Sequence, residues 1–170
     1  MKRKTRSPKK RPMRRDLAAL RARTAADVMS KPLVTVYAHQ TIEHVARLFI
    51  DRRVSSVAVL NELEQPVGVL TTTDLALFAK TNAGQNTEGI ISATSAHPAW
   101  PSVLERMVGT VSPWMSRRVH AVAPSAPLKE VVHQMLKRHL HHLFVKNADG
   151  KGLQGIVTTT DLVRELATFL

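Results

Sequence analysis

The chain of 170 residues contains no cysteine, which excludes disulfide bonds and thiolate metal sites and fits a reducing compartment. Aromatic residues make up only 4% of the chain against 44% hydrophobic residues, so a core must be built mainly from Val, Leu, Ile, Ala and Met. No apolar run approaches the length of a membrane span, and the N-terminal residues lack the apolar stretch of a secretory signal. We therefore expect a cytoplasmic protein without membrane contact.

Acidic residues are almost absent from the first 23 positions, where eleven Lys and Arg face only Asp16. This segment therefore carries +10 of the net charge of +12. Such a run repels itself and offers little to bury, so we expect a disordered basic tail up to about Asp16, followed by a short helix leading into Val28. The tail is either a solvated extension or a non-specific binder of nucleic acid or an acidic partner. A targeting role for residues 8–12 is a further alternative.

An internal repeat organises the remaining sequence. Residues 68–75 (Gly-Val-Leu-Thr-Thr-Thr-Asp-Leu) return at residues 155–162 as Gly-Ile-Val-Thr-Thr-Thr-Asp-Leu. Upstream, the dipeptide Met29-Ser30 returns in register as Met115-Ser116. A repeat of this regularity predicts two copies of one structural unit.

Each copy predicts the order strand, helix, strand, strand, helix. Apolar residues at i, i+3, i+4, i+7 and i+8 predict the first helix of each copy: Ile42, Val45, Ala46, Phe49 and Ile50, and Leu128, Val131, Val132, Met135 and Leu136. Strands are predicted at 34–36, 54–60 and 67–70, and again at 120–122, 140–145 and 153–157. The closing helices are predicted over 75–80 and 162–170.

One unit of about 55 residues is too small to bury both faces of its sheet. We therefore expect an α/β (α+β) fold in which both units pack through their sheets with pseudo-two-fold symmetry. The expected organisation is a basic tail (1–23), repeat 1 (24–80), a linker (81–102) and repeat 2 (103–170) that opens with a short helix at 103–108. The linker is rich in Asn, Gly, Ser, Thr and Ala, which is typical of a long mobile connection.

The doubled motif of glycine, two apolar residues, Thr, two residues and Asp resembles the cystathionine-β-synthase-type (CBS) domain family. It stands here as Gly68/Thr71/Asp74 and Gly155/Thr158/Asp161, and the resemblance covers about residues 24–80 and 103–170. It implies a tandem CBS pair that senses an adenine nucleotide such as AMP, ADP or ATP in clefts between the repeats. Such a pair carries out no catalysis and requires no cofactor. It also implies a homodimer formed through exposed helix faces.

The resemblance also implies roles for individual residues. The motif aspartates would accept hydrogen bonds from the ribose hydroxyls, and the motif threonines would lie near the phosphate: Asp74, Asp161, Thr71, Thr73, Thr158 and Thr160. The base would lie against the first and second strands: Thr35, Val36, Val57, Ala58, Ala121, Val122, Leu143 and Phe144. His141 and His142 stand where many members direct side chains at phosphates. The first repeat has Ser55-Ser56 there, and both repeats lack the family's arginine and proline at this place.

The chemistry of these residues agrees with a ribose site. A carboxylate can accept two hydrogen bonds from a cis-diol, and the N-terminus of the following helix suits a phosphate. Two other interpretations stay open. The Thr and Asp residues also read as ordinary helix caps, and His139 with His141 on one strand face suggests a metal site, although no third ligand is visible.

No pair of nucleophile and base and no metal constellation is visible in the sequence, and the two aspartates belong to equivalent repeats. An enzyme is therefore disfavoured, and neither catalytic residues nor metal ligands are predicted. The leading hypothesis is a regulatory module that senses an adenine nucleotide. The alternative is a protein that binds nucleic acid or an acidic partner through its tail, with the CBS pair as a dimerisation scaffold.

Overall fold

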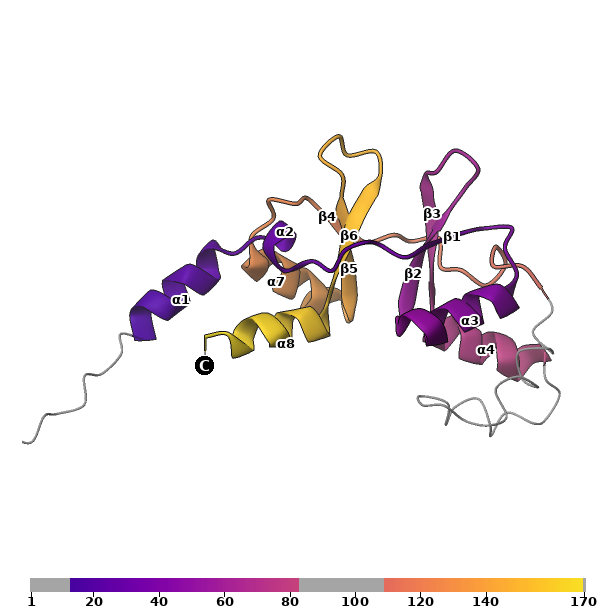
Figure 1. Cartoon of the computed structure of the whole chain (residues 1–170), viewed down its shortest axis with the longest axis horizontal. Coiled ribbons are helices and arrows are strands. Elements are labelled where there is room, and N and C mark those ends of the chain that lie inside the picture. The colour runs from indigo at the N-terminus through magenta and orange to yellow at the C-terminus, as the bar shows by residue number, and fades with distance from the viewer. Residues whose placement is uncertain (1–12, 83–108, 170) are drawn as a thin grey trace, which may run out of the picture.

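A computed structural model describes residues 13–82 and 109–169 (Figure 1). The predicted tail residues 1–12, most of the predicted linker and the predicted helix at 103–108 lie outside this part of the chain. The first half contains α1 (Met13–Ala22), α2 (Ala25–Val28), β1 (Thr35–Tyr37), α3 (Ile42–Arg52), β2 (Ser56–Leu60), β3 (Pro66–Thr71) and α4 (Thr72–Asn82). The second contains β4 (Ala121–Val122), α7 (Leu128–Arg138), β5 (His142–Lys146), β6 (Leu153–Thr158) and α8 (Thr159–Ala167).

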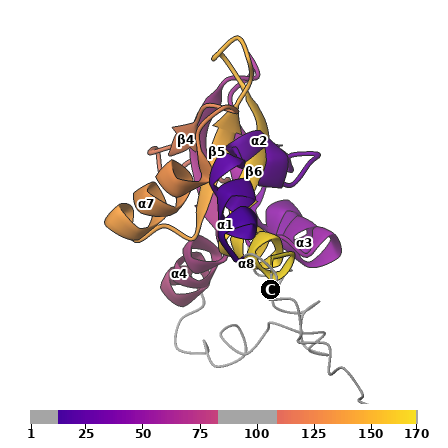
Figure 2. The same cartoon turned by 90° about the vertical axis from the view of Figure 1, so that its left-hand side faces the viewer.

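The two repeats have the same topology, which confirms the predicted order of elements. Each forms a three-stranded sheet, in the order β1-β2-β3 or β4-β5-β6. The first two strands of each sheet are parallel and the last two are antiparallel. Figure 2 shows α3 and α7 on opposite sides of the view with α4 and α8 between them, as a pseudo-two-fold relation between the repeats requires.

Helices α3 and α7 begin and end in equivalent ways. Thr41 caps α3 by accepting a hydrogen bond from the backbone N–H of His44 at 3.2 Å, and Pro127 stands at the same place before α7. Both helices stop at a residue in the left-handed conformation, Arg53 (φ 52°) and His139 (φ 54°). This shared ending turns each chain directly into the central strand of its sheet.

The predicted apolar faces of these helices are right for most positions and wrong for one equivalent pair. Ile42, Val45, Ala46 and Phe49 are buried in α3, as are Leu128, Val131 and Met135 in α7. Ile50 and Leu136, however, are 40% and 71% exposed. Position i+8 has rotated beyond the edge of the stripe that faces the sheet, because an α-helix turns 100° per residue.

Three apolar cores hold the molecule together. Two lie between a sheet and its own helices, and their centres are the fully buried Val57 and Val59 in the first repeat and Leu143 and Val145 in the second. The third lies between the two sheets, where Ala58, Val69 and Phe144 are buried with residues of both repeats around them. The repeats therefore share a core through their sheets, as the sequence predicts.

The segments that precede β1 and β4 are exchanged between the repeats, so that each packs against the other repeat and not against its own. We call residues 24–30 the first leader and residues 110–116 the second leader. The first leader pairs with the second repeat through the bridges Thr24–Pro127 and Ser30–Ile156, and the second leader pairs with the first repeat through Thr41–Thr110 and Val69–Ser116. In Figure 1 the indigo chain runs from α2 across to β1, while the orange chain before β4 crosses in the other direction. Each repeat is thus completed by the leader of the other.

This exchange explains the glycine that opens each motif. A Cβ atom on Gly68 would lie 2.6 Å from Sδ of Met115 and 2.9 Å from the carbonyl oxygen of Ser116. On Gly155 it would lie 2.7 Å from Sδ of Met29. The repeated Met-Ser and the repeated glycine are therefore two sides of one contact, in which the crossing leader leaves no space for a side chain.

The N-terminal helix differs from its prediction. Instead of one helix from about Asp16 to Val28, α1 begins at Met13 and ends at Ala22, and a separate α2 follows. The break lies at Thr24, whose backbone N–H donates to the Asp27 carboxylate at 2.8 Å. Leu20 packs against the core of the second repeat, and Arg23 pairs with Glu165 of α8 at 2.6 Å. The last part of the predicted tail is therefore attached to the second repeat.

Candidate functional site

Both motif aspartates lie at the junction between the last strand of a sheet and the helix that follows. We call the surroundings of each carboxylate the Asp74 corner (Thr71, Asp74, Leu77 and Ser116) and the Asp161 corner (Ser30, Thr158, Asp161 and Arg164). In each corner the crossing leader is fixed to the strand that leads into the aspartate, through the Val69–Ser116 or the Ser30–Ile156 bridge. The motif therefore lies where one repeat meets the leader of the other.

In the Asp74 corner the carboxylate forms a capping box with Thr71. Oδ2 of Asp74 accepts from the backbone N–H and from the hydroxyl of Thr71, both at 2.7 Å. In return, the Asp74 backbone N–H donates to Oγ1 of Thr71 at 3.3 Å. These bonds satisfy the first N–H groups of α4, and they fix the carboxylate at the start of the helix.

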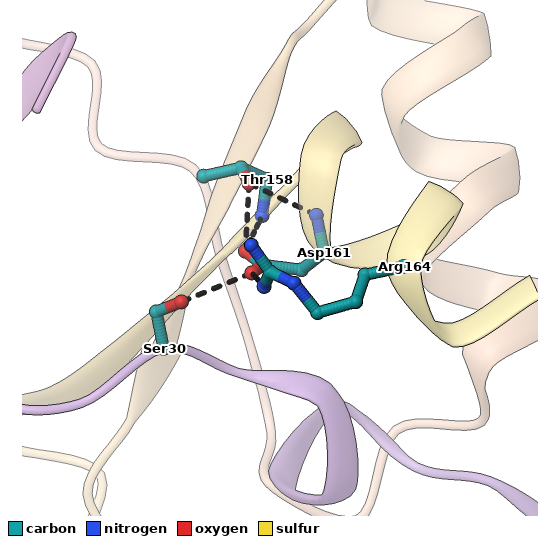
Figure 3. Close-up of polar contacts among 4 residues, drawn as sticks. All are labelled: Ser30, Thr158, Asp161 and Arg164. Atoms are coloured by element: carbon teal, nitrogen blue, oxygen red, sulfur yellow. Dashed lines mark hydrogen bonds and ion pairs between the residues drawn. The ribbon is translucent and has the colours of Figure 1, made fainter. Parts of the chain in front are cut away.

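The Asp161 corner contains the same box and two more donors (Figure 3). Oδ2 of Asp161 accepts from the backbone N–H of Thr158 at 2.8 Å and from its hydroxyl at 2.6 Å. Oδ1 accepts from the Ser30 hydroxyl at 3.0 Å and from Nη1 of Arg164 at 2.8 Å. The capping interpretation of the Thr-Thr-Thr-Asp motif is therefore correct in both repeats. In the part of the chain that the structure describes, only the second carboxylate forms a hydrogen bond with the crossing leader.

Alternation along the strands divides the predicted base-binding residues into two groups. Ala58 and Phe144 point into the core between the sheets, and Thr35 and Ala121 lie beside them in register. Val36, Val57, Val122 and Leu143 point the other way, into the cores between each sheet and its helices. Because neighbouring strand residues face opposite sides, the side chains of this second group do not reach the face between the repeats.

The comparisons with known proteins agree with this architecture. The family model described as "CBS domain" matches residues 25–80 and 108–168. The chain belongs to the CBS domain family. The tandem arrangement expected from the internal repeat is thereby confirmed.

Solved structures of CBS proteins resemble the whole pair. The CBS domain of a CBS-domain-containing membrane protein from Sphaerobacter thermophilus is 25% identical, with a TM-score of 0.67 over 89% of this chain and 92% of that one. The CBS pair of protein MJ0100, in complex with 5′-methylthioadenosine and S-adenosyl-L-methionine, is 22% identical, with a TM-score of 0.65 over 86% and 98%. CBSX2 in complex with AMP is 23% identical, with a TM-score of 0.63 over 85% and 96%.

The two predicted phosphate-directed histidines of the second CBS repeat lie in different surroundings. His142 is half-buried, pairs across the sheet with Thr158 and meets the Phe144 ring edge-on, with centroids 5.5 Å apart. Burial, and then the nearby His141 and His120, lower the pKa of His142. The His141 side chain is exposed, while its carbonyl oxygen accepts from the Thr159 backbone N–H at 3.0 Å. The structure thus places only His142 on the face between the CBS repeats.

The expected strand face shared by His139 and His141 does not exist. His139 ends α7 in the left-handed conformation, and β5 begins only at His142. The metal interpretation therefore loses its geometric basis. Within residues 13–82 and 109–169 no helix is long and apolar enough to cross a membrane.

Sequence reasoning missed two members of the Asp161 corner. Ser30 belongs to the repeated Met-Ser dipeptide, but its partner Asp161 is 131 positions away, and no local pattern predicts such a contact. Arg164 could have been found by aligning the repeats one turn beyond the motif, where the first CBS repeat has Leu77. Thr73 and Thr160 are exposed in the first turns of α4 and α8, and their role near a phosphate stays a prediction.

Proposed function

We propose that this CBS pair is a regulatory module that binds an adenine nucleoside or nucleotide, of the AMP, ADP or ATP type, at the face between its repeats. A motif carboxylate accepts hydrogen bonds from the ribose hydroxyls, and the chain carries out no reaction on the ligand. The observation that carries this proposal is the position of the carboxylates. Each is held at a strand-to-helix junction by a capping box, beside the leader of the other CBS repeat.

The surroundings suit the other parts of such a ligand. Thr35 is exposed and Ala121 is partly accessible on the strands that face the other repeat, next to the buried Ala58 and Phe144. An adenine ring packs well against small or apolar surface of this kind. The exposed hydroxyls of Thr73 and Thr160 lie in first helical turns, where backbone dipoles favour a phosphate. Two structural neighbours of this fold were solved with adenine-containing ligands, AMP in one and S-adenosyl-L-methionine with 5′-methylthioadenosine in the other.

Calorimetric titration of the full chain tests the proposal. AMP, ADP, ATP, S-adenosyl-L-methionine and adenosine are titrated in parallel, with GMP as the control for the base and 2′,3′-dideoxyadenosine as the control for the ribose. We expect saturable binding of at least one adenine ligand and loss of binding with the dideoxy compound. Absence of saturable binding for all five ligands would overturn the proposed function.

We also propose that the pair forms a homodimer through its helices. Large exposed apolar side chains lie on α3, α4, α7 and α8: Ile50, Leu77, Leu136, Val163 and Leu166. Solvent contact of this many aliphatic groups is unfavourable, and a second copy would remove it. Sedimentation equilibrium of the full chain should give twice the chain mass, and a variant with Leu136→Glu and Val163→Glu should give the mass of one chain. A wild-type protein that sediments as a monomer would contradict this assembly.

A further inference from the structure

The two motif carboxylates differ in their remaining capacity to accept hydrogen bonds. A carboxylate offers about four lone-pair sites on its two oxygens. Asp161 uses all of them, for two donors from Thr158, one from Ser30 and one from Arg164. Asp74 accepts two bonds from Thr71, both on Oδ2, and no donor within residues 13–82 and 109–169 reaches its Oδ1. Asp74 therefore keeps the two acceptor sites that a ribose cis-diol requires.

This difference arises from one substitution and one change of partner. The position three residues after the aspartate is Arg164 in the second repeat and Leu77 in the first, and Leu77 has no hydrogen-bond donor in its side chain. The serine of the second leader, Ser116, uses its Oγ to accept from the backbone N–H of Arg118 at 3.4 Å. Ser30 instead donates to Asp161.

The two aspartates also differ in how deeply they are buried. Asp161 is 5% exposed, whereas Asp74 is partly accessible. A ribose can reach Oδ1 of Asp161 only after Arg164 and Ser30 leave it. Arg164 is 69% exposed, so its ion pair alone is weak. Ser30 is different, because it belongs to the first leader, whose backbone bonds Ile156 in both directions at 2.8 and 3.3 Å.

We propose that the two corners have different functions. The Asp74 corner holds the ribose, and one adenine ligand binds per chain. The Asp161 corner is a structural clasp that fixes the first leader on the second repeat, with Arg164 and Ser30 as its internal substitutes for the ribose hydroxyls. This inference rests on the proposed function for the identity of the ligand, whereas the clasp itself can be measured without any ligand.

Stoichiometry and matched variants test the ligand half of the proposal. With AMP and adenosine as probes, the wild-type chain should bind one molecule per chain. Asp74→Asn should weaken binding at least about tenfold, because the amide has only one oxygen for both Thr71 and the ribose. Asp161→Asn should leave the Kd within about twofold of wild type. The exchange variant Leu77→Arg, which copies the second corner onto the first, should weaken binding to a similar extent as Asp74→Asn.

The reverse exchange opens the second corner. Arg164→Leu combined with Ser30→Ala frees Oδ1 of Asp161 and should raise the stoichiometry from one to two ligands per chain, or leave it at one if the leader still covers the carboxylate. The first result supports competition by the internal donors, and the second supports a clasp held by the leader backbone. Two equal sites in the wild type, or equal losses from Asp74→Asn and Asp161→Asn, would overturn the inference and leave the proposed function standing. No binding of AMP or adenosine to the wild type would overturn the inference, and absence of binding for all five adenine ligands would overturn the proposed function as well.

A measurement without ligand tests the clasp. In urea denaturation of the unliganded chain, Asp161→Asn should lower the midpoint clearly more than Asp74→Asn, because it disturbs four hydrogen bonds in a buried place and not two. Equal shifts of the two midpoints would contradict the clasp.

Discussion

Met29 lies so close over Gly155 that a Cβ on the glycine would be 2.7 Å from its Sδ atom. Replacement of Gly155 by alanine should therefore destabilise the fold by about 1–3 kcal/mol, the range of overpacked cores. The same change at Gly68 should cost somewhat more, because its Cβ would lie 2.9 Å from the rigid Ser116 carbonyl oxygen, whereas a Cβ on Gly155 would lie 3.1 Å from the Ser30 carbonyl oxygen. Urea denaturation of both variants measures these costs.

Double variants separate side-chain from backbone crowding. Met29→Ala removes the flexible atoms over Gly155 and should recover part of the stability lost in Gly155→Ala. Met115→Ala should recover slightly less in Gly68→Ala, since the Ser116 carbonyl oxygen remains at 2.9 Å from the added Cβ, against 3.1 Å for the Ser30 carbonyl oxygen at Gly155. If both pairs behave additively, the crossing leaders do not press on the glycines.

Phe78 in α4 and Glu165 in α8 occupy equivalent helix positions. Phe78 contacts the second leader through Trp114, and Glu165 contacts Arg23, the residue just before the first leader. Phe78 is buried and meets the Trp114 ring edge-on at 5.0 Å, so Phe78→Ala should cost about 3–5 kcal/mol. Glu165 pairs with Arg23, whose side chain is 43% exposed, and Glu165→Ala should cost less than about 1 kcal/mol. Thermal unfolding of both variants compares their losses of stability. Equal losses would contradict the conclusion that the buried Phe78 contact stabilises the fold more than the exposed ion pair of Glu165.

The fold was largely predictable from sequence because the patterns that indicate it are local and occur twice. The 3.6-residue stripes of α3 and α7 and the motif at the end of each sheet occur twice in register, and each copy supports the other. The exchange of leaders was not predictable, since nothing in residues 24–30 indicates whether they pack on the near or the distant sheet. The base-binding assignment failed to separate Val57 from Ala58, because the strand pattern there is apolar on both faces and gives no alternation to read.

Acid should destabilise the chain in the range where histidine titrates. Burial lowers the pKa of His142, and burial with Arg138 and Arg118 nearby lowers that of His120. The unfolded chain, with histidine pKa values of about 6.5, then binds protons more strongly than the folded chain. Stability is therefore full above that value and falls as pH is lowered through it towards the folded-state pKa values. Urea midpoints between pH 7.5 and 5.5 measure the slope.

His142→Gln should flatten this slope, and addition of His120→Asn should flatten it further. His133 is exposed on α7, and His133→Gln serves as the matched control for replacing a histidine by glutamine. A slope that survives the double variant intact would assign the pH dependence to other groups.

The basic tail should act independently of the ligand site. Residues 2–12 contain seven Lys and Arg, whereas Leu20 and Arg23 contact the second repeat. Removal of residues 2–12 alone should therefore preserve AMP affinity and the unfolding midpoint. It should also abolish any binding to a random-sequence DNA duplex, which in the full chain should weaken steeply between about 50 and 200 mM salt. Undiminished DNA binding by the truncated chain would locate the basic site in the folded repeats.

The exchanged leaders also set the order in which the molecule can fold. The hairpins β2–β3 and β5–β6 join neighbouring stretches of chain and can form early, whereas the bond from Ser30 to Asp161 closes a loop of 131 residues. Contacts of such long range are slow to form and come late. During synthesis the first leader has no docking surface until β6 and α8 have been made. The first leader is therefore translated well before the strand and helix on which it docks.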